Sequence, residues 1–565
     1  MLAIAQSVKE VVLIKKKASK MPTILALNLE IILYCKINKI DFITPFQNSN
    51  YHNTSKKILL NSKKLLDSFD LSVLKYDFLI NDLRAIIRCK FNQVAFLIET
   101  INNIKHKYEK IIYTNLYSKP PDHGNTKKFF GEEYINIEDT LNILKLNNLE
   151  KIEISKEKEK EKEKNKKLYS YEIKGLKYKK EKKIILNNAG YNFKRIIYFF
   201  LKTRLKIAVP KNDLNFLKKI IFYILGIELY KFQKNKEVIK NIDIPKLTCN
   251  FVYENYDLSE IINKEISIAK FYLANLVEKY KAFLTYFDLS NLKLVVCNAN
   301  REIGSILFEA ASRKNVKSII ISHGTISKSY DEYDKIYKEY IAEGVFLGRS
   351  NIKTIQSKIS KKSLETLTVS GNIVETGNLI FSENLKNNSY DKKNILYAVT
   401  NKRLPGLQIH GVEYFFEFFN NLELLNNFSK KNQCRIIIHL HPGAIKNLNN
   451  LKKIFKNLNF HVGDISTSLK KSFVTISYSS TVIEDSLYNK VPVILLDLHK
   501  KNYIHFESEL NPEIKNKSLY YINNLEDLKK CIDTIRQSKK INFNEYIYDK
   551  EAIKNVRNFF KNYIK

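Results

Sequence analysis

Apolar and polar residues alternate along the chain in a regular rhythm from about residue 291 onward. Short apolar runs, mostly β-branched, take turns with amphipathic stretches of helical period. Continuous apolar strands between amphipathic helices indicate parallel sheets that are covered on both faces. The runs that predict strands are "LKLVVCNAN", "VKSIIISHG" and "LETLTVSGN", then, after the polar linker "SENLKNNSYDKK", "NILYAVTN", "CRIIIHLHPG", "NFHVGD" and "FVTISYSS". We therefore expect an α/β protein with two Rossmann-like, doubly wound parallel-sheet domains.

The N-terminal half has a less regular pattern. Helix-like and strand-like segments alternate up to about residue 105, with "KIDFITPF" as a strand and one or two long helices over 80–117. Residues 106–280 are predicted to be a helical, charged, basic insertion, with a solvated linker near 153–167. The expected order is a first domain split between 1–105 and 281–382, a nucleotide-binding domain over 383–545, and a C-terminal helix over 546–565.

Two interpretations stay open for residues 193–230, which hold two basic, aromatic-rich segments broken by Pro210. They are either two helices that pack into a core or a surface that lies on an anionic bilayer. Aromatic residues interleaved with basic ones also occur where proteins stack on nucleic-acid bases. No RNP, KH or zinc-finger pattern accompanies them here, so nucleic acid is not an expected partner.

The charge balance is strongly basic, since 95 Lys and Arg against 59 Asp and Glu give a formal net charge of +36. Lys, Asn and Ile are abundant together, as in AT-rich genomes, which accounts for part of the charge. The rest suits an anionic partner such as a nucleotide-sugar or a membrane face. The six cysteines show no paired or metal-ligand spacing, and no apolar stretch reaches the roughly 20 residues of a spanning helix. We expect a cytoplasmic protein, free or peripheral on the inner face of the membrane.

Polar residues directly after predicted strands are the site candidates, because ligands of doubly wound sheets bind beyond the carboxyl ends of the strands. His323 follows one such run and stands next to a glycine; a histidine titrates near neutrality and suits general-base work. His441 follows another run, and Pro442 biases it toward an extended conformation. Asn401 and Lys402, followed by Arg403, come after the first strand of the second domain and offer contacts to a diphosphate.

A fourth strand-end loop carries three hydroxyls in a row, Ser479, Ser480 and Thr481, at the start of a predicted helix. N-capping explains one of these hydroxyls and leaves two for a ligand. Helix amides and hydroxyl donors together suit an anion such as phosphate. Glu484 lies one turn into the helix, where it can accept hydrogen bonds from sugar hydroxyls; an ordinary exposed helical glutamate is the alternative.

These loops, in this order, resemble the GT-B glycosyltransferase superfamily. The stretches "NANREIGSILFEAASRKNVKSIIISHGT", "TLTVSGNI", "IIIHLHPG" and "ISYSSTVIEDSLYNKVPVILL" are similar to bacterial capsule and surface-polysaccharide transferases with His-Pro and Ser-Ser/Thr motifs, which use CMP-sialic acid, CMP-Kdo or CDP-glycerol. The resemblance implies two Rossmann-like domains that face a cleft and a metal-independent transfer. It covers residues 290–500 well, 21–105 faintly and 106–280 not at all.

The resemblance also implies roles for the strand-end residues. His441 and Pro442 would contact the nucleotide, the hydroxyl loop its phosphate, and Glu484 the ribose or donor sugar. His323 would face the cleft as the base. Sialyltransferases of this kind carry an acidic pair before a glycine, whereas this chain has the single carboxylate Glu343 in Ala342-Glu343-Gly344, so the base stays open between His323 and Glu343.

The expected activity is transfer of a sugar or alditol-phosphate group from a CMP- or CDP-linked donor to a glycan or lipid-linked glycan acceptor, in capsule or lipopolysaccharide synthesis, with no cofactor and no metal. Two alternatives belong to other classes. A sugar-nucleotide epimerase on the same architecture would share the phosphate loop and need no acceptor. A non-catalytic basic protein would bind nucleic acid or anionic lipid in a salt-dependent way.

Overall fold

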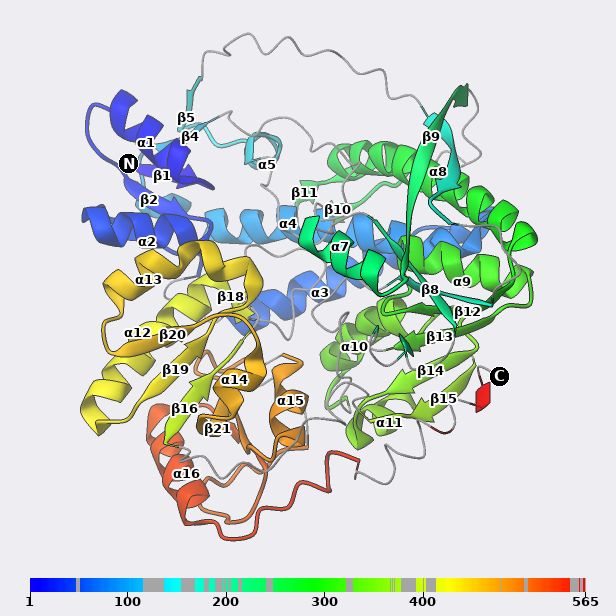
Figure 1. The fold of residues 1–565 in the computed structure, drawn as a ribbon. Helices are drawn as coiled ribbons and strands as arrows, with labels where there is room; N and C mark the ends of the chain where they lie inside the picture. The colour runs from blue at the N-terminus through cyan, green and yellow to red at the C-terminus, as the bar shows by residue number, and fades with distance from the viewer. Residues whose placement is uncertain are drawn as a thin grey trace.

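The chain folds around three mainly parallel sheets, as the computed structural model shows (Figure 1). The structure describes residues 1–46, 51–114, 137–153, 168–176, 182–187, 197, 200–201, 205–211, 216–239, 247–321, 329–365, 367, 369, 371–377, 393–399, 401–402, 413–478, 480–501, 507–548, 558 and 562–563. Within these ranges, no helix is both long enough and apolar enough to cross a membrane.

The N-terminal sheet has five parallel strands in the order β3-β2-β1-β4-β5. Its strands are β1 (Leu2–Ala5), β2 (Thr23–Ala26), β3 (Phe42–Ile43), β4 (Ile111–Thr114) and β5 (Leu149–Ile152). The helices of this part are α1 (Val8–Lys17), α2 (Leu29–Asn38), α3 (Tyr51–Asp67), α4 (Ile80–Ile104) and α5 (Ile137–Leu144), with short 3-10 turns η1 (Leu71–Val73), η2 (Asp77–Leu79) and η3 (Lys105–Lys107).

The middle sheet has eight strands in the order β15-β14-β13-β12-β7-β8-β9-β6, all pairs parallel except β6 with β9. The strands are β6 (Leu168–Lys174), β7 (Lys183–Asn187), β8 (Lys206–Pro210), β9 (Glu228–Ile239), β12 (Leu292–Cys297), β13 (Lys317–Ile321), β14 (Ile352–Ile355) and β15 (Asn372–Glu375). A hairpin of β10 (Val252–Tyr253) and β11 (Tyr256–Asp257) lies outside it. The helices are α7 (Phe216–Ile224), α8 (Ser259–Leu289), α9 (Ile303–Arg313), α10 (Glu332–Val345) and α11 (Lys358–Leu364).

The C-terminal sheet has six parallel strands in the order β20-β19-β16-β21-β22-β23. They are β16 (Asn394–Tyr397), β19 (Ile436–His439), β20 (Leu458–His461), β21 (Ser472–Ser477), β22 (Val493–Leu496) and β23 (Leu519–Ile522), while β17 (Asn401–Lys402) pairs with β18 (Glu413–Tyr414). The helices are α12 (Phe415–Asn432), α13 (Leu448–Ile454), α14 (Ile465–Leu469), α15 (Val482–Tyr488) and α16 (Leu525–Gln537), with the 3-10 segment η5 (Pro442–Asn447).

The apolar runs become buried strands because both faces of each sheet are covered. All four residues of β22 are buried, for example, as are those of β14. Polar caps set helix starts: α16 begins after Asn524, whose side chain accepts a hydrogen bond of 2.8 Å from the Asp527 amide. One apolar cluster contains Ile4, Val295 and Ile476 and therefore runs through all three sheets.

The α/β class with doubly wound parallel sheets is confirmed, but the N-terminal half is organised differently from the prediction. Residues 1–105 and 281–382 were expected to share a sheet. Instead β4 pairs with β1, and β5 with β4, to complete the first sheet, while β12 to β15 join β7 to β9 in the middle sheet through the pairing of β12 with β7. The sequence pattern hid this because both strands lie next to charged segments, and β5, "LEKI", itself carries two charged residues.

The expected helical insertion over 106–280 is the second correction. It holds the long helix α8, but also the strands β4 to β11. Alternation of lysines with apolar residues, as in "ELYKFQKNKEVI" of β9, suits a strand with one solvated face as well as it suits a basic helix. Most of the predicted linker over 153–167 and most of the predicted C-terminal helix lie outside the described residues. The strand predicted from "LETLTVSGN" is displaced: β15 begins only at Asn372.

Candidate functional site

The C-terminal sheet has the strand order 3-2-1-4-5-6 when its strands are numbered along the chain, with β16 first and β21 fourth. After β16 the chain builds β19 and β20 on one side, and then crosses to β21 on the other. Ligands of such sheets bind in the crevice at this switch point, beyond the carboxyl ends of the strands. The Ser477 hydroxyl donates a 2.7 Å hydrogen bond to the Ala398 carbonyl, so the two loops that form the crevice start side by side.

The predicted hydroxyl loop is the one that leaves β21 at this switch point. Ser480 is half-buried, and its Oγ accepts a 3.3 Å hydrogen bond from the Val482 amide. Thr481 is exposed, and Ser479 lies outside the described residues. The Ser480 hydroxyl therefore binds the first amide of α15, whereas Thr481, the N-cap residue, makes no side-chain capping hydrogen bond. Helix α15 has only seven residues, so its dipole contributes little here.

The predicted His-Pro loop leaves β19, the neighbour of β16 on the other side. His441 is exposed at the edge of the sheet, and its carbonyl accepts a 2.8 Å hydrogen bond from the Ala444 amide. His439 is half-buried: its Nδ1 is 2.9 Å from the Ser468 hydroxyl, and burial lowers the pKa of its imidazole. Of the two histidines, His441 is the more exposed.

Asn401 and Lys402 form the two-residue strand β17, which pairs with Glu413 and Tyr414. The structure does not describe the side chains of Asn401, Lys402 and Pro442, and Arg403 lies outside the described residues. The backbone of β17 still places these residues in the loop that follows β16.

Glu484 is buried, with 1 % of its surface exposed. Burial raises the pKa of the Tyr548 hydroxyl most, followed by Glu375 at the end of β15, and the nearby Glu484 carboxylate adds a smaller effect. Glu484 therefore stands where α15 meets the end of the middle sheet. Its contact with a donor sugar stays a prediction.

Behind the strand-end loops lies a buried polar network that the sequence did not reveal. Glu413 accepts hydrogen bonds of 2.5 Å from the Tyr397 hydroxyl and 2.9 Å from the Asn421 amide. Burial raises the pKa of the Glu413 carboxyl to about 7, although these two hydrogen bonds lower it. These groups connect the end of β16 with β18 and α12.

A buried ion pair extends this network toward β22. Lys501 Nζ lies 2.8 Å from Glu417 Oε2, with 5 % and 1 % of the side chains exposed, and 5.2 Å from the centre of the Tyr478 ring. Asp497, directly after β22, accepts hydrogen bonds from the Lys501 amide at 3.1 Å and the Tyr521 hydroxyl at 2.6 Å. The position of Asp497 immediately after an apolar strand is the signal that would have pointed to it.

Helix α3, which belongs to the N-terminal sheet, packs against this polar network. The Tyr51 ring contacts the Tyr414 ring with centroids 5.7 Å apart. His52 is buried, which lowers the pKa of its imidazole; Lys56 lowers it further, while Asp497 and Asp331 raise it. His52 therefore lies within electrostatic range of carboxylates from both the C-terminal domain and the loop after β13.

That loop is the one that carries the predicted base. His323 lies in its undescribed part, over 322–328, and the described chain resumes just before Asp331. Lys338 Nζ lies 2.5 Å from Asp334 Oδ2, and both side chains are buried. Burial lowers the pKa of Lys338 to about 8, although Asp334 raises it. Elements of all three sheets thus meet at one polar junction beside the switch point.

Glu343, the other predicted base, has a different setting. It is buried near the end of α10, and its carboxylate lies 3.1 Å from Arg84 Nε and 3.2 Å from an Arg88 guanidinium nitrogen. The Arg88 guanidinium carbon lies 3.6 Å from the centre of the Tyr340 ring. These contacts give Glu343 the setting of a counter-ion between α4 and α10.

The N-terminal sheet also has a switch point, between β1 and β4, but the chain fills it with its own carboxylate. Glu10 Oε2 accepts hydrogen bonds from the Gln6 amide at 2.6 Å and the Ser7 amide at 2.9 Å, and the Thr114 hydroxyl donates to Oε1 at 2.6 Å. The amides that would hold a phosphate are therefore occupied. In the observed conformation an anion cannot bind at the Gln6 and Ser7 amides.

The middle sheet has its switch point between β7 and β12, where the chain turns sharply from β12 into α9. Glu302 adopts φ 57° and ψ −124°, a strained conformation for a side chain with a Cβ. Its amide donates a 2.8 Å hydrogen bond to Asp82, and burial, followed by Asp82, raises the pKa of Glu302 to about 8. A Cβ on Gly304 would lie 2.0 Å from the Ala299 carbonyl oxygen, so this turn needs glycine there.

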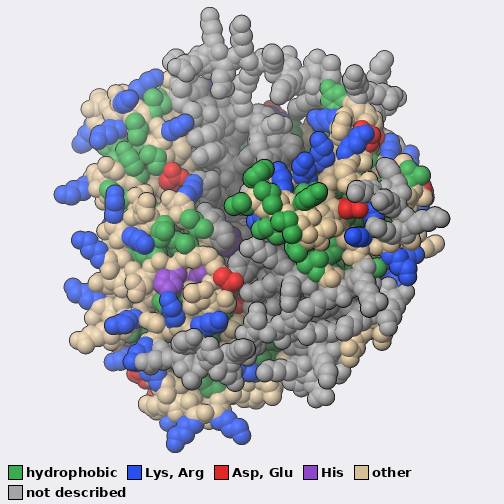
Figure 2. All heavy atoms as spheres, in the orientation of Figure 1, with side chains coloured by type: hydrophobic (Ala, Val, Ile, Leu, Met, Phe, Trp, Pro, Cys, Tyr) green, Lys and Arg blue, Asp and Glu red, His purple; other side chains and the backbone are tan. Residues whose placement is uncertain are grey.

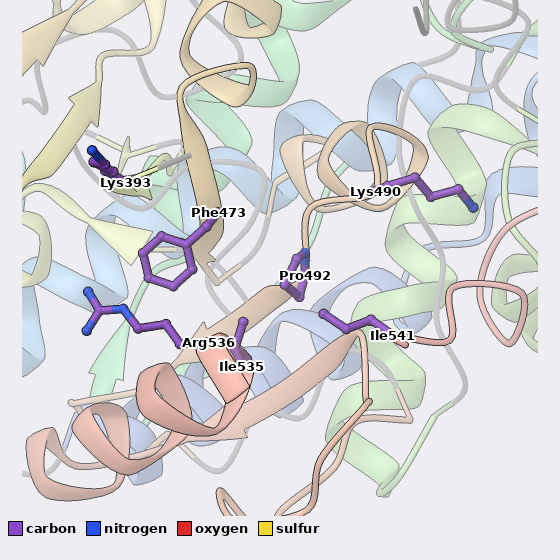
Figure 3. A pocket seen from close by; sticks show the side chains of 7 residues that line it. All are labelled: Lys393, Phe473, Lys490, Pro492, Ile535, Arg536 and Ile541. Atoms are coloured by element: carbon purple, nitrogen blue, oxygen red, sulfur yellow. The ribbon is translucent and has the colours of Figure 1, made fainter. Parts of the chain in front are cut away.

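A cavity of about 480 Å³ opens in the C-terminal domain, but at the end of the sheet opposite the switch point (Figure 3). Lys393 precedes β16 and Pro492 precedes β22, so the cavity lies at the amino ends of the strands. The Arg536 guanidinium lies 5.0 Å from the centre of the Phe473 ring. This location separates the cavity from the switch point where the predicted residues gather.

No protein-family model and no curated protein sequence matches the chain. Among solved structures it is similar to the UDP-GlcNAc 2-epimerase from Methanocaldococcus jannaschii, with 16% identity, 67% of this chain and 99% of that chain covered, and a TM-score of 0.39. For the UDP-GlcNAc 2-epimerase from Neisseria meningitidis, bound to UDP-GlcNAc, the identity is 14%, 68% of this chain and 99% of that chain are covered, and the TM-score is 0.37. For the wall teichoic acid polymerase TagF the identity is 14%, 69% of this chain and 89% of that chain are covered, and the TM-score is 0.39. At these identities and TM-scores the likeness does not assign the chain to a superfamily or to an activity.

Proposed function

We propose that this protein transfers a sugar or alditol-phosphate group from a CMP- or CDP-linked donor to a glycan acceptor of surface-polysaccharide synthesis. The observation that carries the proposal is the contrast between two switch points. In the N-terminal sheet, Glu10 occupies the amides at the crevice. In the C-terminal sheet, the Ser477 hydroxyl bonds to the Ala398 carbonyl at the switch point, and the loop that follows carries half-buried Ser480 and exposed Thr481. The reaction class rests on the resemblance of the motifs.

The donor nucleotide would lie across the carboxyl ends of β19, β16 and β21. Hydroxyls of the loop after β21 would hold the phosphate next to the leaving oxygen, and His441 would border the nucleotide. A hydrogen bond to a charged group contributes about 1.5–3 kcal/mol. Because these donors are positioned before the reaction, they would stabilise the charge that develops on the leaving phosphate.

The acceptor would enter from the junction with the other two sheets. The loop after β13, with His323, would take the proton of the attacking hydroxyl. His52 and Asp331 would face the acceptor from α3 and from the start of α10. With a CMP-sugar the attack breaks the bond from the sugar to the phosphate oxygen; with a CDP-alditol it breaks the diphosphate. The leaving group is CMP in both cases.

Nucleotide binding is the first test. Thermal unfolding of the full chain is measured with CMP, CDP, UDP, GDP and ADP, since a ligand at 100 times its Kd adds about 2.7 kcal/mol to the stability. We expect the cytidine nucleotides to raise the Tm. Ser480→Ala should reduce this increase. Ser538→Ala is the matched control, since Ser538 is also half-buried and its Oγ also accepts one backbone hydrogen bond, from Asn516 at 3.0 Å.

Release of CMP from a panel of CMP- and CDP-linked donors, with and without glycan acceptors and with EDTA present, tests the reaction. Acceptor-dependent release would support transfer. Interconversion of sugar-nucleotides without release would establish an epimerase instead. If no nucleotide changes the Tm and no donor is consumed, the proposed site is wrong.

A further inference from the structure

Helix α7 exposes an unusual number of large apolar side chains. Its sequence is "FLKKIIFYI", and the exposed fractions run from 41 % for Ile220 to 84 % for Tyr223. Isolated exposed apolar residues are normal on protein surfaces. Here, in contrast, seven of the large apolar residues exposed in the described chain fall within ten consecutive positions, namely Phe216, Leu217, Ile220, Ile221, Tyr223, Ile224 and Leu225. They form one patch over α7 in Figure 2.

The helix is held to the protein by few residues. Phe222 is its buried residue and belongs, with Ile227 of the following turn, to the apolar cluster on one face of the middle sheet. The exposed residues include positions 216, 220, 223 and 224, which lie on one face of a helix. The apolar face of α7 is therefore turned outward, whereas surface helices of a globular protein turn theirs toward the core. An apolar face of this kind marks an interaction surface.

Lysines are frequent in α7 and in the segments next to it in the sequence. The side chains described over 205–211 and 216–235 include one carboxylate, Glu228, which lies 2.9 Å from Lys183. The same segments hold six lysines, Lys206, Lys211, Lys218, Lys219, Lys231 and Lys234. Lys218 and Lys219 lie on α7 itself, between its two apolar turns. The surface thus combines insertable apolar side chains with an excess of positive charge.

We propose that α7 is a membrane-docking element that inserts its apolar side chains into the interface of a bilayer containing anionic lipid. Apolar and aromatic residues bury themselves at the boundary of headgroups and acyl chains, and neighbouring lysines are attracted to anionic headgroups. The charge complementarity favours a lipid surface over a second copy of this chain, because two copies would bring their lysines together. The proposal does not depend on the transfer reaction, but it would place the protein where lipid-linked acceptors are found.

Sedimentation of the full chain with vesicles tests the proposal. We compare vesicles of pure phosphatidylcholine with vesicles that also contain phosphatidylglycerol, at about one anionic lipid in three. We expect binding to the anionic vesicles that weakens with salt. The variant Phe216→Ser/Tyr223→Ser/Ile224→Ser should lose at least about tenfold in vesicle affinity, since it removes most of the inserted area. Lys218→Gln/Lys219→Gln should reduce binding to the anionic vesicles and flatten the salt dependence.

Three exposed apolar residues elsewhere supply the control, Leu424→Ser/Leu510→Ser/Ile514→Ser. This control should bind vesicles like the wild type, and both triple variants should keep the wild-type Tm because the replaced side chains are exposed. The proposal fails if the wild type does not bind anionic vesicles, or if the α7 variant binds them as well as the control does. A wild type that stays off vesicles but self-associates through α7, and becomes monomeric in the α7 variant, would replace the lipid by a second copy of the chain.

Discussion

The buried pair of Lys501 and Glu417 allows a sharp test of the polar junction. The Nζ to Oε2 distance is 2.8 Å, and 5 % and 1 % of the two side chains are exposed. Lys501→Met keeps the aliphatic stem and leaves the Glu417 carboxylate buried without its cation. Removing one partner of a buried pair costs about 3–5 kcal/mol, because the remaining charge stays out of water. For a domain of this size, 1 kcal/mol corresponds to about 2–4 °C in Tm, so the expected decrease is roughly 6–20 °C.

The double variant Lys501→Met/Glu417→Gln should recover much of this loss. Replacing both charges by neutral groups of similar shape is often nearly neutral. The Tyr414 amide donates a 2.8 Å hydrogen bond to the Glu417 carboxylate, and the carbonyl oxygen of the introduced glutamine side chain can still accept it. We therefore expect a coupling of at least about 2 kcal/mol in the double-mutant cycle. Urea unfolding followed by tyrosine fluorescence suits this chain, which has 34 Tyr and no Trp.

An exposed pair provides the matched control. Lys530 lies 3.5 Å from Asp527, with 54 % and 34 % of the side chains exposed, and exposed pairs contribute about 0–1 kcal/mol. Lys530→Met should therefore change the free energy of unfolding little. If Lys501→Met costs no more than Lys530→Met, or if the two changes at the buried pair are simply additive, then the pair does not hold the junction together.

Two further predictions concern the turn after β12. Burial and Asp82 raise the pKa of Glu302 from the usual 4.5 to about 8. Between these two pH values the folded chain keeps a proton that the unfolded chain loses. The contribution of this proton to stability is therefore complete below about pH 4.5 and is lost as the pH rises through 8. Glu302→Gln should flatten the fall of stability over this window, by at most about 1.4 kcal/mol per pH unit, and unchanged slopes in urea unfolding would contradict the assignment. Gly304→Ala places a Cβ 2.0 Å from the Ala299 carbonyl oxygen and should destabilise the middle domain by roughly 1–3 kcal/mol; an Ala variant as stable as the wild type would show that the turn can relax.

The α/β class and the loops of the C-terminal domain could be predicted from the amino-acid sequence. Apolar runs such as "IIIHLHPG" and "FVTISYSS" became buried strands followed by the predicted polar loops, because a strand covered on both faces must be continuously apolar and must end where polar residues begin. His441, Ser480 and Thr481 could therefore be placed at one edge of one sheet without coordinates.

Which strands share a sheet, and which distant residues meet, became visible only in the folded chain. A local pattern does not show which strands pair, so nothing in the sequence showed that β4 pairs with β1, and β5 with β4, rather than lead into an insertion. Glu343 looked like a base beside a glycine, and only its contacts with Arg84 and Arg88 gave it the setting of a counter-ion.

His52, Glu417 and Lys501 are the clearest cases, since they come from segments far apart in the chain and no local pattern marks them. Periodicity records whether a side chain faces water or the core, and this information is local. The partner of a buried charge is set by how the three sheets pack together, which depends on the whole chain at once.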